Sequence, residues 1–91
     1  MIKFLYTVYD SKARTYSNPF TAVNQQVAIR DFTQAANDIN SQIHQFPGDF
    51  KLLEIGEFDD ESCVMNLHPE PLPLGLAHNY LESERNYDVR S

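Results

Sequence analysis

The sequence predicts a small α+β domain with the element order ββαββ. We expect a four-stranded, mainly antiparallel sheet with one long helix on one face and an extended Pro/Leu-rich C-terminal tail. Residues 2–9 alternate with the period of a β-strand, residues 25–44 carry apolar side chains at helical spacing, and strand-like stretches follow at 50–58 and 63–67. At 91 residues and 10.5 kDa, the chain has room for one hydrophobic core.

The first two strands are expected to form a hairpin. Apolar and aromatic side chains at positions 2, 4, 6 and 8 share one face of the first strand. Residues 10–14 are polar and turn-prone, and the stretch from Tyr16 to Val23 is a possible pairing partner. Because Pro19 has no N–H to donate, it places this second strand at a sheet edge or breaks it with a bulge.

A helix over residues 25–44 is expected to cover the sheet. Asn24 can accept a backbone hydrogen bond as its N-cap. A helix of this length would measure roughly 30 Å, enough to cross a small sheet, and it ends before Pro47 and Gly48. The side chains predicted on its buried face are Ala28, Phe32, Ala35, Ala36, Ile39 and Ile43.

The strand at 50–58 is apolar on both faces. Leu53 and Ile55 are expected to point one way, and Phe50, Leu52 and Phe58 the other. An acidic turn at 59–62 and a short strand at 63–67 complete a core domain over residues 1–67. One helix can cover only one face, so a second copy or the tail should cover the other.

Residues 68–91 are expected to form an extended arm and an acidic tail. Three prolines between 69 and 73 favour a polyproline-type path over 68–76, with three leucines on roughly one side. A short helix could follow at 77–84, with a frayed end at 85–91. We expect a homodimer, and the residues expected in its interface are Phe50, Leu52, Leu72, Leu74 and Leu76.

The chain is acidic overall but basic at its start. The net charge is −6 and the isoelectric point is about 4.8, which argues against a surface that grips nucleic acid everywhere. Residues 1–30 nevertheless hold four basic residues against one acid. No apolar run predicts a membrane span, and the first residues do not resemble a secretory signal, so we expect a cytosolic protein.

The sequence does not predict an enzyme. The three histidines at 44, 68 and 78 lack metal-site spacing, and no nucleophile motif or phosphate-binding glycine loop is present. Cys63 is the only cysteine, and its place in a predicted strand favours a buried structural thiol. The acidic stretch 59–61 favours a solvated turn over a cation site. We expect no metal and no cofactor.

Tyrosines and cations near the N-terminus suggest a nucleic-acid surface. Aromatic rings can stack on unpaired bases while cations follow the phosphates. The alternative is that these side chains are ordinary core and strand-surface residues. The residues that would bind are Lys3, Tyr9, Lys12, Arg14, Tyr16 and Arg30.

Five short motifs, in order and at compatible spacing, resemble one phage family. They are Tyr9-Asp10-Ser11-Lys12-Ala13, Pro19-Phe20, Ala28-Ile29-Arg30-Asp31-Phe32, Phe46-Pro47-Gly48-Asp49-Phe50-Lys51-Leu52 and Gly56-Glu57-Phe58-Asp59. Over about residues 2–60 the chain resembles the small non-structural protein of gokushovirus-type microviruses, phages with single-stranded circular DNA genomes.

The resemblance implies DNA binding, or action in the switch from genome replication to packaging, in the cytoplasm of a bacterial host. A dimer would double the small basic patch. The alternative class is a protein–protein adaptor, whose acidic turn and tail would contact the phage replication initiator, the procapsid or a host factor.

Overall fold

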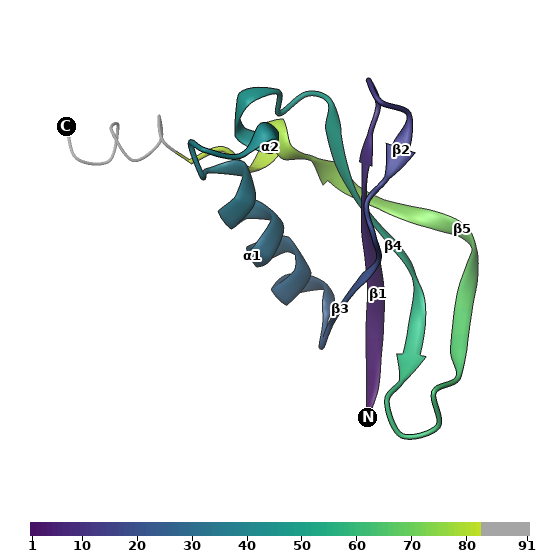
Figure 1. Cartoon of the computed structure of the whole chain (residues 1–91). Coiled ribbons are helices and arrows are strands. Elements are labelled where there is room, and N and C mark those ends of the chain that lie inside the picture. The colour runs from purple at the N-terminus through teal and green to yellow at the C-terminus, as the bar shows by residue number, and fades with distance from the viewer. Residues whose placement is uncertain (83–91) are drawn as a thin grey trace.

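The computed structural model describes residues 1–82 and confirms the α+β fold (Figure 1). One antiparallel sheet has the strand order β2-β1-β4-β5, and β3 also pairs with β1. The strands are β1 Ile2–Asp10, β2 Thr15–Tyr16, β3 Phe20–Ala22, β4 Phe50–Asp59 and β5 Met65–Leu76. The helices are α1 Gln25–Ala36, α2 Gln42–Gln45 and a 3-10 helix, η1, at Ala77–Tyr80. The C-terminal residues 85–91 expected to fray lie outside the described residues, as does most of the acidic tail.

The predicted second strand is divided in two at the sheet edge. β2 pairs with the end of β1, and β3 pairs with its middle, opposite Phe4 to Tyr6. Pro19 lies between them, which confirms that it interrupts pairing at an edge. Because β4 occupies the other side of β1 along its whole length, β1 is fully inside the sheet.

The β1–β2 turn and the β4–β5 turn share the same hydrogen-bond pattern. The Asp10 side chain accepts the N–H of Lys12, and the Asp59 side chain accepts the N–H of Glu61. The carbonyls of the same aspartates accept the N–H of Arg14 and of Cys63, whose φ angles are 60° and 65°. The expectation of a buried Cys63 thiol was therefore wrong, because this residue is exposed at the end of a turn.

The predicted 25–44 helix is wrong in its second half. Asn24 does cap α1, accepting the N–H of Val27 at 2.9 Å, but α1 ends at Ala36 and α2 is a separate short helix. At the break, the Asn37 amide donates to Thr33 O and Tyr80 O, so this side chain competes with helix continuation. Ile39, expected in the core, is 72% exposed.

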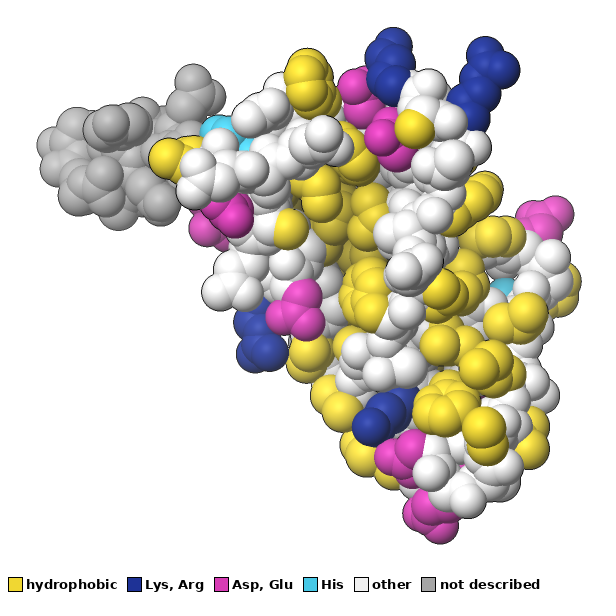
Figure 2. All heavy atoms as spheres, in the orientation of Figure 1, with side chains coloured by type: hydrophobic (Ala, Val, Ile, Leu, Met, Phe, Trp, Pro, Cys, Tyr) yellow, Lys and Arg dark blue, Asp and Glu magenta, His cyan; other side chains and the backbone are white. Residues whose placement is uncertain are grey.

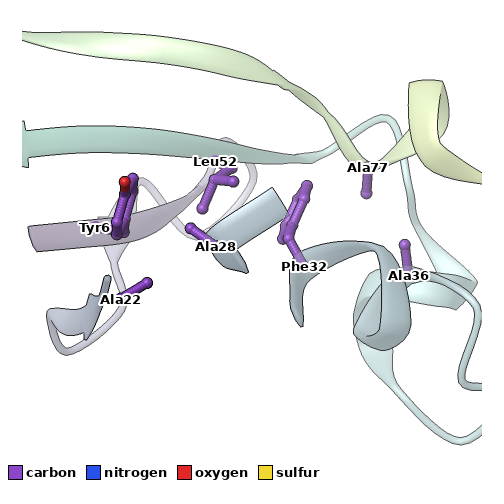
Figure 3. Close-up of a cluster of buried hydrophobic side chains, with 7 residues drawn as sticks. All are labelled: Tyr6, Ala22, Ala28, Phe32, Ala36, Leu52 and Ala77. Atoms are coloured by element: carbon purple, nitrogen blue, oxygen red, sulfur yellow. The ribbon is translucent and has the colours of Figure 1, made fainter. Parts of the chain in front are cut away.

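The core lies between α1 and one face of the sheet. Tyr6 and Leu52 are the largest fully buried side chains, and they belong to one buried cluster with Phe32 of α1 (Figure 3). The small alanine side chains in the core let α1 and the 3-10 helix η1 approach each other closely. Burial of each large apolar side chain contributes about 1.5–3 kcal/mol to the stability of the fold. The core cluster is Tyr6, Ala22, Ala28, Phe32, Ala36, Leu52 and Ala77.

The Pro/Leu-rich segment is part of the sheet. β5 continues through residues 68–76, so the expected short strand at 63–67 and the extended segment after it form one edge strand. The three leucines do not share a side, because a register shift at Gly75, where φ is 127°, separates them. Leu74 packs on the core, whereas Leu76 lies opposite Lys51 on the other face.

The predicted helix at 77–84 is reduced to η1, which closes the end of the core. The Tyr80 ring lies edge-on to Phe32, and its hydroxyl donates to Leu74 O. Asn37 bonds Tyr80 O and the N–H of Glu82 at 3.0 and 2.9 Å. Within residues 1–82 no helix is long and apolar enough to cross a membrane.

Candidate nucleic-acid interface

Two tyrosines and a lysine form a row across the sheet face that α1 does not cover, which we call the open face. Antiparallel register places Tyr16 opposite Tyr9, Tyr9 opposite Lys51, and Lys51 opposite Leu76. Directly opposed residues of an antiparallel sheet share a face, with Cβ atoms about 4.5–5.5 Å apart. We call Tyr16, Tyr9 and Lys51 the tyrosine row.

The two rings of the tyrosine row lie against each other. Their centroids are 4.7 Å apart and their planes are tilted by 44°. Tyr16 is 59% exposed and Tyr9 is partly exposed, so ring surface remains available to a ligand. Such a surface can stack on unpaired bases of any sequence.

The β1–β2 turn brings two further cations to the end of this row. Lys12 and Arg14 are exposed, and the Asp10 carboxylate nearby accepts the N–H groups of Lys12 and Ala13. None of the ion pairs found among residues 1–82 includes Lys12, Arg14 or Lys51. Three cations therefore stand at one end of an acidic protein.

Two of the six predicted binding residues lie elsewhere. Lys3 is on the open face but six residues along β1 from Tyr9, or about 20 Å, and its ammonium lies 3.4 Å from Asp60. Arg30 is on α1, over the opposite face, 3.8 Å from Asp31. Figure 2 shows the dark-blue side chains at separate places on the visible face, over the β1–β2 turn, on α1 and near the other end of β1.

Lys51 is the residue that the sequence prediction missed. The sequence places Lys51 in the right strand, but only the β1–β4 register sets it beside Tyr9. One sequence signal could have found it, because the alternation within residues 50–58 puts Lys51 on the same face as Leu53 and Ile55. That alternation misplaces Phe58, because the register shift at Ile55 turns it to the open face opposite Lys3.

The residues predicted for a dimer interface are divided between core and surface. Leu52 is fully buried beneath α1, and Phe50 and Leu74 pack against the core. These three side chains are thus occupied within one chain. Leu72 and Leu76 are exposed, but on different faces of the sheet.

A groove lies on the open face beside the tyrosine row. Its volume is about 410 Å³, and Tyr16 belongs to both features. Thr7 and Ile55 are in its central strands, and the segments around Ser17 and His68 flank it. The full lining is Thr7, Tyr16, Ser17, Pro19, Ile55, Leu67, His68 and Pro71.

A buried carboxylate lies within the sheet near this groove. Glu54 accepts the Tyr6 hydroxyl at 3.1 Å and lies 2.9 Å from His68 Nε2. Burial, followed by the charge of Glu54, raises the pKa of the Tyr6 hydroxyl above its ordinary value. Among the described residues, no group of three His, Cys, Asp or Glu could hold a metal ion.

Comparison with known proteins identifies relatives of the chain. Residues 3–80 match the family model described as Phage ORF5 protein. Protein ORF5 of Chlamydia phage 1, a gokushovirus-type microvirus, is 37% identical over 65 residues, which cover 67% of this chain and 68% of that protein. No solved structure matches the chain.

Proposed function

The chain belongs to the Phage ORF5 protein family and is a small phage protein, and from this premise we propose that it binds single-stranded DNA weakly and without sequence preference. The ligand in the infected cell would be the phage genome, in the host cytoplasm, during replication or packaging. The activity proposed is binding, not catalysis.

The tyrosine row with the basic turn at its end is the observation that carries the proposal. Stacking on Tyr9 and Tyr16 contributes roughly 1–3 kcal/mol per base and tolerates every base. Lys12, Arg14 and Lys51 supply phosphate contacts beside the rings. Three cations are few for a nucleic-acid binder, which is the reason to expect weak binding.

Dimerisation is a second part of the proposal, because a second copy would double the number of rings and cations. The outer edge of β5 does not suit strand pairing between copies. Pro69, Pro71 and Pro73 have no N–H to donate along that edge. Leu72 and Leu76 are the predicted interface residues still exposed, so the dimer should form through side chains. Light scattering at micromolar concentration tests this, and a 10.5 kDa particle would contradict it.

A salt titration tests DNA binding. Fluorescence anisotropy with a labelled oligo-dT should show binding at low salt, with a slope of log K against log salt near −2 if three phosphates are neutralised. Lys12→Glu should lower both affinity and slope. Arg30→Glu is the matched control, since it makes the same charge change on α1, away from the tyrosine row.

The outcomes separate the proposal from the adaptor alternative. Equal effects of Lys12→Glu and Arg30→Glu would mean that net charge, not this surface, governs binding. No binding by the unmodified protein at low salt would contradict DNA binding and favour an adaptor that contacts a phage or host protein.

A further inference from the structure

We propose that the groove beside the tyrosine row holds one unpaired nucleobase of the bound strand. This inference rests on the proposed function and adds a specific base site to it. It concerns the space between residues 16–19 and 67–71 on the open face.

The two sides of the groove are tied to the sheet. On one side, Thr7 Oγ1 lies 2.8 Å from Ser17 O, and Ser17 Oγ accepts the N–H of Val8 at 3.0 Å. On the other, four residues of β5, 68–71, lie opposite the single residue Ile55, so the strand bulges. His68 secures this bulge through its contact with Glu54. The groove therefore exists without a ligand.

The lining suits the apolar face of a flat ring. Tyr16, Pro19, Leu67 and Pro71 offer apolar surface. Leu67 is 66% exposed, and contact with a base would remove much of this surface from water.

Charge and continuity favour a nucleotide over an apolar peptide. Tyr16 lies in both the groove and the tyrosine row, so a strand stacked on the row reaches the groove at its next base. Lys51 lies at the other end of the tyrosine row, beside Tyr9, and the basic turn joins Tyr9 to Tyr16, so these cations are available to the phosphates of the stacked strand. A peptide added as a β-strand needs free backbone groups, whereas Thr7 and Ile55 lie in strands that pair on both sides.

Filling the groove tests the inference. Leu67→Trp places a large ring in the groove and should weaken binding to a dT hexamer at least fivefold. Met65→Trp is the matched control, because Met65 is 58% exposed on the same strand and does not line the groove. Equal unfolding temperatures of the two variants would establish that Leu67→Trp is folded.

Hexamers with one abasic residue, moved through each position, provide the second measurement. For the unmodified protein and Met65→Trp, one interior position should weaken binding at least fivefold when its base is removed. Leu67→Trp should have lost this position dependence. Equal affinities of the two tryptophan variants, or the same position dependence in both, would overturn the base site while leaving DNA binding intact. Failure of the unmodified protein to bind the intact hexamer would overturn both proposals.

Discussion

At the residue scale, Arg14 combines a proposed binding role with a left-handed backbone conformation. Its φ of 60° is one that glycine adopts without cost, so Arg14→Gly removes a cation from a turn that accepts the replacement. We expect stability to be unchanged within about 1 kcal/mol or to rise, and DNA affinity and salt slope to fall. Cys63→Gly makes the same backbone change in the β4–β5 turn and should not alter binding. Thermal unfolding and anisotropy measure both effects, and equal binding losses would contradict the role of Arg14.

The hydroxyl of Tyr6 is expected to stabilise the fold. Tyr6→Phe removes the hydroxyl that donates a hydrogen bond to the Glu54 carboxylate, and His68 remains as the side-chain partner of Glu54. A buried acceptor that loses its hydrogen-bond donor lowers the free energy of unfolding by about 1–3 kcal/mol, and urea unfolding would measure this loss. Tyr9→Phe, on the partly exposed ring, should change stability by less than about 0.5 kcal/mol. Equal effects of the two variants would argue against a structural role for the Tyr6–Glu54 bond.

Asp59 should make the β4–β5 turn sensitive to acid. Hydrogen bonds from the backbone of Glu61 and from Ser62 lower the pKa of Asp59 below its ordinary value of 3.8. The pKa of Asp59 is lower in the folded protein than in the unfolded chain, so the ionised carboxylate stabilises the fold at pH values above the unfolded-state pKa. This stabilisation is lost as the pH falls through the folded-state pKa. Asp59→Asn should therefore be less stable than the unmodified protein at pH 7, and the difference should vanish in the acid range below 3.8. A difference independent of pH would contradict this account.

At the element scale, Gly56 stands where β4 and β5 leave no room for a side chain. A Cβ there would lie 2.4 Å from Asn66 O and 2.8 Å from Leu67 Cα, both backbone atoms that cannot turn aside. Gly56→Ala should destabilise the protein by about 1–3 kcal/mol or more, because it forces the strands apart. Gly48→Ala meets nothing within 4 Å and is the control, expected to be neutral or slightly stabilising in chemical denaturation. If the stability of Gly56→Ala equalled that of the unmodified protein, β5 would be able to move away from β4 without cost.

At the scale of the whole molecule, the described fold extends beyond Ala77. Removal of residues after Ala77 takes away Tyr80, which packs on Phe32, and the Asn37 bonds to Tyr80 and Glu82. We expect this truncation to cost at least about 2 kcal/mol, because it removes the partly buried Tyr80 ring together with these hydrogen bonds. Truncation after Glu82 keeps these contacts and is the suitable variant for testing the tail in DNA binding. Equal unfolding temperatures for the two truncations would contradict the structural role of η1.

The sequence alone determined the features that depend on neighbouring residues. The alternation in residues 2–9, the Asn24 cap and the interruption at Pro19 follow from side-chain chemistry within a few positions, and all three are present. The grouping of Tyr9, Lys12, Arg14 and Tyr16 was predictable for the same reason, since one hairpin holds them.

Only the tertiary structure decided what depends on distant pairing. The β1–β4 register sets Lys51 beside Tyr9, and register shifts at Ile55 and Gly75 turn Phe58 and Leu76 to the open face. The helix ends at Ala36 partly because Asn37 bonds Tyr80, 43 residues away. Register, bulges and such contacts are selected by the packing energy of the whole sheet and core, and a local pattern of apolar residues is compatible with more than one of them.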